Sequence, residues 1–109
     1  MLESKFKRQE KERFEKLGWV FLTLEPGGGV PMGMLDTLCI SPYGYSCYVE
    51  WKKSINAKKQ PLQDYWHKKL NKMGHDAFFV YPENIGEWRQ EITNKNYQSK
   101  VDFMRRNLS

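Results

Sequence analysis

The sequence predicts an α/β domain in which helices flank a mixed four-stranded sheet, with the element order α-β-β-β-α-β-α. Two observations support this fold class. Short apolar runs typical of strands occur together with longer segments of helical periodicity. The second and third runs are joined by the turn SPYGY, as in an antiparallel hairpin, whereas a helix separates the third run from the fourth, as in a crossover connection. All 109 residues are expected to form one domain.

The first helix is expected at residues 3–17. Phe6, Phe14 and Leu17 fall on one face of this segment, and Gly18 ends the helical pattern. The segment therefore predicts an amphipathic helix that buries this face.

Four apolar runs predict the strands. The Gly- and Pro-rich segment 25–33 predicts a loop after the first strand, and the polar segment 53–59 predicts a loop after the third. The predicted strands are residues 19–24, 34–40, 46–52 and 76–81.

The second half of the chain predicts further helices. A crossover helix is expected at 61–74, starting at a proline and ending at a glycine. A short helix is expected at 84–92. The segment 94–109 is either a helix or a swapped or partly disordered arm. The core stripe of the crossover helix is expected to be Leu62, Trp66, Leu70 and Met73, and the C-terminal segment carries Val101, Phe103 and Met104.

Composition excludes some classes of protein. No apolar run approaches the roughly 20 residues needed to cross a bilayer, and the charged first residues do not resemble a secretory signal. Eighteen Lys and Arg against thirteen Asp and Glu give a net charge of +5. This charge is compatible with a polyanionic partner and equally with an ordinary solvated surface.

The cysteines and histidines do not predict a metal site. Cys39 and Cys47 lie in strand-like runs and are expected to be buried, reduced thiols. His67 and His75 lack the spacing of metal ligands.

Two carboxylates on the hairpin strands point to chemistry instead. Asp36 lies in an otherwise apolar run, and Glu50 lies near the end of the next strand. Burying such groups together is costly unless a cation lies between them, and carboxylate oxygens suit Mg²⁺ or Mn²⁺. Lys52 is expected on the same strand face as Glu50, because side chains alternate along a strand. The alternative interpretation of Glu50 and Lys52 is a structural ion pair.

Five motifs in this order resemble the virus-type replication-repair nuclease (VRR-NUC) domains of the PD-(D/E)xK nuclease superfamily, in particular small stand-alone phage members. The resemblance covers about residues 2–90, with 94–109 as a C-terminal extension. Two positions depart from the family pattern, because Leu35 replaces a proline and Trp51 replaces a smaller aliphatic residue. The matching motifs are Glu3-Ser4-Lys5, Gly18-Trp19, Gly33-Met34-Leu35-Asp36, Glu50-Trp51-Lys52, and Gln63 on a helix that ends at Gly74.

The resemblance implies a restriction-endonuclease-like fold and roles for particular residues. Asp36, Glu50 and the backbone carbonyl of Trp51 would hold Mg²⁺ or Mn²⁺. Lys52 would orient the attacking water or stabilise developing charge, and Gln63 would hydrogen-bond Lys52 or a water.

An acid on the first helix is expected to complete this site. Glu3 is the candidate by resemblance, and Glu10 is its rival, because the two lie seven residues apart on the same helix face.

The resemblance also implies a divalent-metal-dependent DNA endonuclease that prefers branched or four-way DNA. It further implies a homodimer, and a phage protein that acts in the cytoplasm of the bacterial host. Two alternatives are a non-catalytic module that binds DNA or a protein, and a structural or inhibitory phage protein. The lysines expected to contact DNA are Lys53, Lys58, Lys59 and Lys68.

Overall fold

The computed structural model describes the backbone of residues 3–108 and the side chains of residues 5–108. The predicted order of helices and strands is confirmed, with one short 3-10 turn added before the last helix. The elements are α1 (Glu3–Glu15), β1 (Val20–Thr23), β2 (Thr37–Ile40), β3 (Ser46–Trp51), α2 (Pro61–Lys72), β4 (Asp76–Val80), η1 (Pro82–Asn84) and α3 (Ile85–Leu108).

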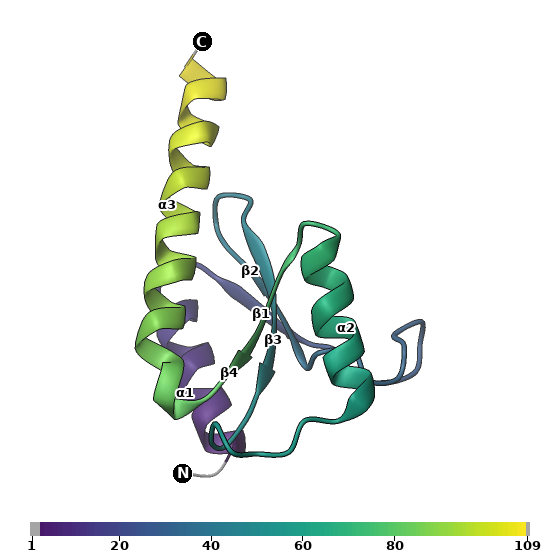
Figure 1. The fold of residues 1–109 in the computed structure, drawn as a ribbon. Helices are drawn as coiled ribbons and strands as arrows, with labels where there is room; N and C mark the ends of the chain where they lie inside the picture. The colour runs from purple at the N-terminus through teal and green to yellow at the C-terminus, as the bar shows by residue number, and fades with distance from the viewer. Residues whose placement is uncertain (1–2, 109) are drawn as a thin grey trace.

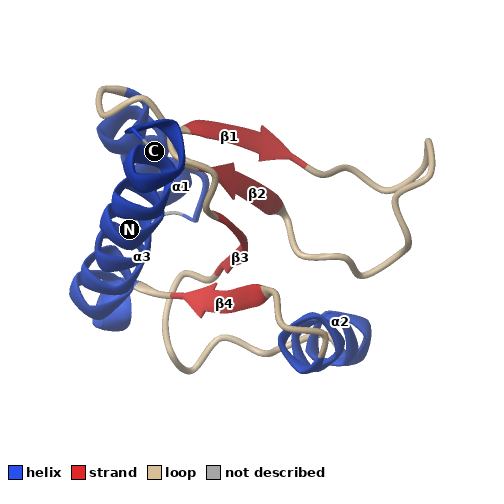
Figure 2. Cartoon of the chain, turned by 90° about the horizontal axis from the view of Figure 1, so that it is seen from above, coloured by secondary structure: helices blue, strands red, loops and turns tan. Residues whose placement is uncertain are grey.

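The four strands form one mixed sheet in the order β1-β2-β3-β4. The β1–β2 and β2–β3 pairs are antiparallel, and the crossover through α2 makes β3 and β4 parallel. Helices α1 and α3 lie on one side of this sheet and α2 lies on the other (Figure 2). The predicted fold class is therefore confirmed.

Each face of the sheet has its own apolar core. The larger core lies under α1 and α3, and it is built largely from aromatic rings. The smaller core lies under α2. The large core contains Phe6, Phe14, Trp19, Phe21, Cys39, Cys47, Val49, Trp51, Val80, Trp88 and Ile92, and the small core contains Leu35, Leu70 and Ala77.

The predicted apolar stripes of α1 and α2 are partly wrong. The side chain of Leu17 is 63% exposed, because α1 ends at Glu15 and the chain turns at Gly18 with a φ of +91°. Leu62 and Met73 are also exposed, at 51% and 61%. Helix α2 packs mainly on β4, so only the middle of its stripe reaches the sheet.

The C-terminal segment is neither a separate short helix nor an irregular arm. It continues the last helix without a break, so that α3 has 24 residues. Trp88 and Ile92 bury the first half of α3 against the sheet. The second half extends beyond the sheet, far from the N-terminus (Figure 1). No helix within residues 3–108 is long and apolar enough to cross a membrane.

The two cysteines are free and buried, which confirms the prediction made from the sequence. Cys39 and Cys47 face each other across β2 and β3 in the large core. Burial, together with contact with Cys47, raises the pKa of the Cys39 thiol well above its ordinary value. The thiol is therefore protonated at neutral pH.

Candidate active site at the ends of β2 and β3

Asp36 and Glu50 lie directly opposite each other. Asp36 precedes β2, one residue beyond the Thr37–Val49 pair of the antiparallel ladder. Its backbone N–H donates a hydrogen bond of 3.0 Å to Oε1 of Glu50. The prediction that Asp36 lies in the middle of a strand is wrong, because the strand begins only at Thr37. Asp36 therefore lies at the partly open end of the hairpin, where solvent and ligands have access.

Glu50 and Lys52 are both buried, and they point toward the α2 side of the sheet. The ammonium of Lys52 donates a hydrogen bond of 2.8 Å to Oε1 of Gln63, near the start of α2. The contact between Lys52 and Gln63 anticipated from the sequence is therefore present. The backbone N–H of Lys52 also donates to the carbonyl of Val80 at 2.9 Å, which fixes this end of β3 to β4.

Trp51 faces the opposite side of the sheet from its two charged neighbours. Its ring packs edge-on against Phe6 and Trp88 in the large core, with centroids 5.6 and 5.4 Å away. Its indole N–H donates to Oγ1 of Thr37 at 2.8 Å, and the Thr37 hydroxyl donates to Oδ2 of Asp36 at 2.9 Å. The large residue inside the E-x-K motif thus helps to orient the Asp36 carboxylate.

Lys7 of α1 is a further charged group at the site. Its ammonium lies 2.7 Å from Oδ2 of Asp36 and donates to the Thr23 hydroxyl at 3.2 Å. Neither Lys7 nor Thr37 was predicted from the sequence. Lys7 follows Glu3 by four residues, so it shares a helix face with a predicted site residue, and this spacing was the available signal.

The donor groups present fit a hard divalent cation. Asp36, just before β2, and Glu50, on β3, provide carboxylate oxygens, and the Lys7 ammonium shows that a positive charge is accommodated beside the Asp36 carboxylate. Among the residues that the structure describes, no group of three or more Asp, Glu, His or Cys side chains gathers at one point. The side chain of Glu3, the predicted third acid, lies outside the described residues.

Glu10, the rival of Glu3, has a different partner. Its carboxylate is buried and accepts two hydrogen bonds from the Arg89 guanidinium of α3, at 2.9 and 2.6 Å. This contact with Glu10 raises the pKa of Arg89 above its ordinary value. Glu10 therefore connects α1 to α3, on the side of α1 that faces the large core.

Replacement of this buried acid should affect stability. We expect Glu10→Ala to lower the free energy of unfolding by roughly 2–3 kcal/mol, because it removes two charge-assisted hydrogen bonds. Thermal or urea unfolding measures the change. Glu12→Ala, an exposed acid on the same helix, is the control, with an expected change within about 0.5 kcal/mol. Equal effects of the two variants would contradict a bridging role for Glu10.

The four lysines predicted to contact DNA have different surroundings. Lys53 and Lys58 are exposed in the loop between β3 and α2. The ammonium of Lys59 lies 4.6 Å from the centre of the Phe79 ring. Lys68 pairs with Asp64 at 2.9 Å on the outside of α2, and this pairing lowers the pKa of the Asp64 carboxyl. The loop lysines are therefore better placed than Lys68 to donate hydrogen bonds to a phosphate.

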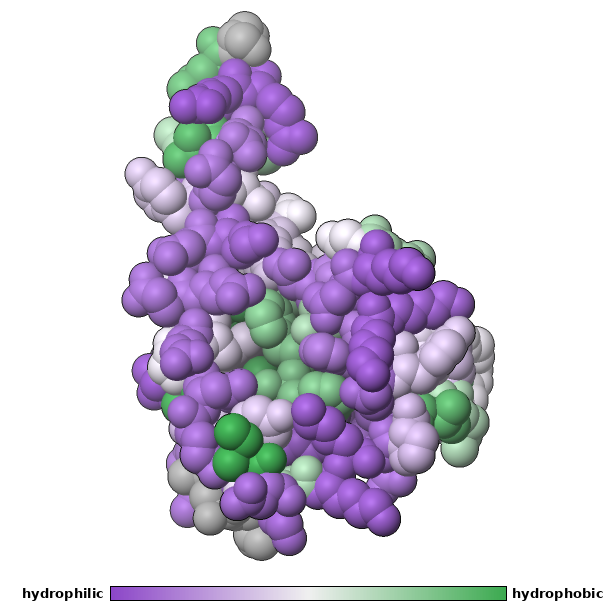
Figure 3. Space-filling view, viewed as in Figure 1, coloured by the Kyte–Doolittle hydropathy of each residue, from purple (hydrophilic) through white to green (hydrophobic). Residues whose placement is uncertain are grey.

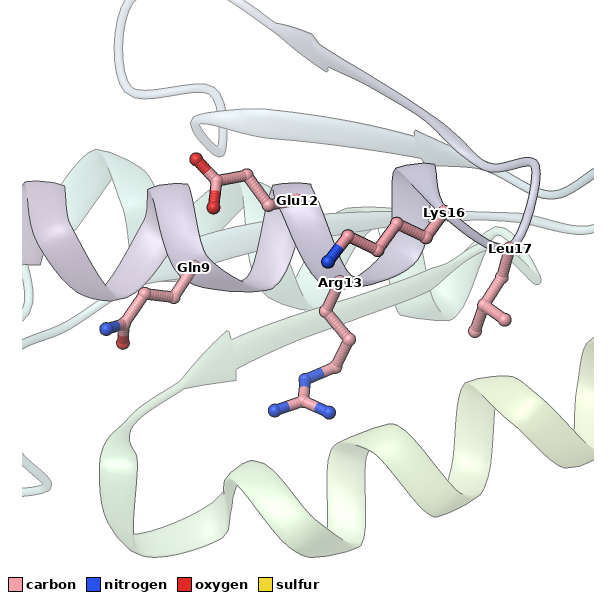
Figure 4. A pocket seen from close by; sticks show the side chains of 5 residues that line it. All are labelled: Gln9, Glu12, Arg13, Lys16 and Leu17. Atoms are coloured by element: carbon pink, nitrogen blue, oxygen red, sulfur yellow. The ribbon is translucent and has the colours of Figure 1, made fainter.

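A separate hollow lies along the outer side of α1 and has a volume of about 450 Å³ (Figure 4). Its lining residues are exposed, and none of them is predicted for catalysis. We assign no chemistry to this hollow. The residues that line it are Gln9, Glu12, Arg13, Lys16 and Leu17.

Comparison with known proteins gives one informative result. No protein-family model matches the chain, and no curated protein matches it. A solved structure described as "VRR_NUC domain" is similar to the chain, with 37% sequence identity and a TM-score of 0.63. The match covers 72% of this chain and 82% of that one. The similarity thus extends to sequence as well as to fold.

Proposed function

We propose that this chain, which belongs to the VRR_NUC domain family and has its nuclease fold, is a divalent-metal-dependent endonuclease that acts on DNA. One observation carries the proposal. Glu50 accepts a hydrogen bond from the backbone of Asp36, Lys52 follows Glu50 by two residues, and Gln63 of α2 accepts a hydrogen bond from Lys52. Burying charged groups in this way is costly, and such clusters are typical of catalytic sites.

Each residue has a distinct part in the proposed reaction. Asp36 and Glu50 hold the cation, with help from the Trp51 carbonyl. A bound divalent ion supplies an activated water and neutralises charge on the phosphate. Lys52, held by Gln63, donates a hydrogen bond to the attacking water or to a phosphate oxygen that gains charge.

Glu3 is the proposed further acid of the site. It lies one helical turn before Lys7, whose ammonium reaches Asp36. With Glu10 paired to Arg89, Glu3 is the better candidate of the two acids. We expect Glu3→Gln to reduce cleavage and Glu10→Gln to act mainly on stability.

We propose branched DNA as the substrate, with Lys53, Lys58, Lys59 and Lys68 along its backbone. The test is incubation of the protein with labelled linear, flapped and four-way DNA in Mg²⁺, Mn²⁺ or EDTA. We expect cleavage in either metal and none in EDTA, with the branched substrates cut faster. Equal cleavage of all three substrates would refute the preference for branched DNA.

A non-catalytic DNA- or protein-binding module is the second candidate. One observation favours it, since the Lys7 ammonium pairs with Asp36, which is one of the proposed metal ligands. The same incubation separates the two functions. Binding of branched DNA without cleavage in either metal would support the non-catalytic module.

We also propose that the chain is a homodimer that uses the projecting half of α3. Tyr97, Met104 and Leu108 are exposed and share one helix face, turned away from the buried Trp88 and Ile92. Apolar residues are visible near the free end of α3 (Figure 3). Packing this face against a second copy would remove it from water.

Charge on this face should break the dimer. We expect the wild-type chain to sediment as a dimer at micromolar concentration. The double variant with Met104→Lys and Leu108→Lys should sediment as a monomer. Gln98→Lys adds charge to another face of the same helix and is the control. A wild-type chain that remains monomeric, with or without branched DNA, would refute the dimer.

A further inference from the structure

A partly apolar groove opens beside the catalytic end of α2. It has a volume of about 440 Å³. Gln63 belongs both to this groove and to the site, because its side-chain oxygen accepts the hydrogen bond from Lys52. The groove is therefore continuous with the proposed catalytic site. Its lining residues are Met32, Gly33, Gln60, Pro61, Leu62 and Gln63.

The loop that carries Met32 is fixed against α2. The indole N–H of Trp66 donates to the Met32 carbonyl at 3.1 Å. Gly33 has a φ of +80°, and a Cβ at this position would overlap the side chain of Leu62. Only glycine therefore allows the loop to approach α2 so closely. The backbone at Met32 is thus held in place, although the segment is rich in Gly and Pro.

The side chains at the mouth of the groove are nevertheless exposed. Met32 is 69% exposed and Leu62 is 51% exposed. In the space-filling view, a small apolar area lies among weakly polar residues at the edge of the molecule where the loop between β1 and β2 lies (Figure 3). A single exposed apolar residue is ordinary, but two that flank a groove on a fixed backbone are typical of a binding surface.

The chemistry of the groove matches a nucleobase. Apolar side chains such as Met, Leu and Pro insert between bases and unstack them, and amides hydrogen-bond to base edges. Met32, Leu62 and Pro61 provide the first type of contact, and Gln60 and Gln63 provide the second. Successive nucleotides of a strand are only about 3.4 Å apart along the helix axis. A phosphate beside Lys52 would therefore bring a neighbouring base to the groove.

We propose that Met32 and Leu62 form a wedge beside the groove. The wedge separates the bases next to the scissile phosphate, and the groove receives an unpaired or unstacked base. This proposal rests on the proposed function and names the feature that selects branched DNA. Bases at a branch point are already partly unstacked, so they enter the groove at a lower free-energy cost than bases of an intact duplex. The wedge thus links substrate shape to the catalytic residues through Gln63.

The test uses the full chain and four-way DNA that carries 2-aminopurine at the branch, because this base becomes more fluorescent when it is unstacked. Binding is measured in EDTA, so the readout does not require cleavage. We expect the wild type to raise the fluorescence roughly twofold or more, and Met32→Ala to lose this rise. Met32→Leu, which keeps an apolar side chain, should restore it. Met73→Ala removes a similarly exposed methionine at the other end of α2 and should behave as the wild type.

Cleavage in Mg²⁺ is the second readout. We expect Met32→Ala to lose about tenfold in kcat/KM on four-way DNA and little on linear DNA. A Met32→Ala protein with the fluorescence rise of the wild type would overturn the wedge, whatever its cleavage rate. If the wild type cuts no DNA but still gives the Met32-dependent rise in fluorescence, the endonuclease function is refuted and the wedge is supported.

Discussion

Asp36→Asn is expected to abolish DNA cleavage and to leave the fold intact. The amide keeps the shape of the side chain but removes a negative charge that holds the metal. Loss of one such ligand charge should slow cleavage at least roughly a thousandfold, which corresponds to about 4 kcal/mol of activation free energy. Single-turnover cleavage of labelled four-way DNA in Mg²⁺ measures the effect.

The structure limits the effect of this substitution on folding. Asp36 is partly exposed, and its ion pair with Lys7 is expected to contribute no more than about 1 kcal/mol. The backbone N–H that donates to Glu50 is unchanged by the substitution. The melting temperature should therefore fall by only a few degrees. Asp64→Asn, at a half-exposed acid of α2, is the control. A variant that cuts at the wild-type rate would show that Asp36 is not a metal ligand.

Lys52→Ala should be nearly inactive while it still binds metal and DNA. The ammonium acts on the water or on the phosphate in the transition state, and it does not hold the ion. We expect a loss of about a hundredfold to a thousandfold in kcat. Calorimetric titration with Mn²⁺ should give an affinity close to that of the wild type.

Burial of Lys52 calls for a second variant. Alanine would leave a cavity at this buried position and would lose the hydrogen bond to Gln63. Lys52→Met fills the space without the charge, so it separates catalysis from packing. Loss of Mn²⁺ affinity in both variants would mean that Lys52 is the structural partner of Glu50, which is the alternative interpretation of the motif.

The sequence was sufficient to predict the fold class because the fold depends on local patterns. Strand-like runs and glycine positions mark most boundaries to within three residues. The continuous helix α3 was missed, although no proline or glycine interrupts residues 87–108. Exposure of Leu17 and Leu62 was also missed, because it depends on how far each helix extends over the sheet.

In the candidate site, too, residues in local patterns could be predicted, and residues whose contacts depend on packing could not. Asp36, Glu50 and Lys52 could be proposed from the sequence because charged residues interrupt apolar runs, and such interruptions are visible in one sequence. Lys7 and Thr37 were missed, because their contacts with Asp36 depend on how α1 and the sheet pack. The pair between Glu10 and Arg89 joins residues 79 positions apart, and no local pattern predicts it.

The central claim is that the carboxylates at the ends of β2 and β3 hold a divalent cation on which DNA cleavage depends. The most direct test is the rate at which the wild-type protein cuts labelled four-way DNA as free Mn²⁺ is raised from zero, in metal-buffered solution. We predict no cleavage in EDTA, a rate that saturates with Mn²⁺, and full recovery when metal is restored after chelation. Cleavage in EDTA at an undiminished rate would contradict the account, as would absence of cleavage at every Mn²⁺ concentration.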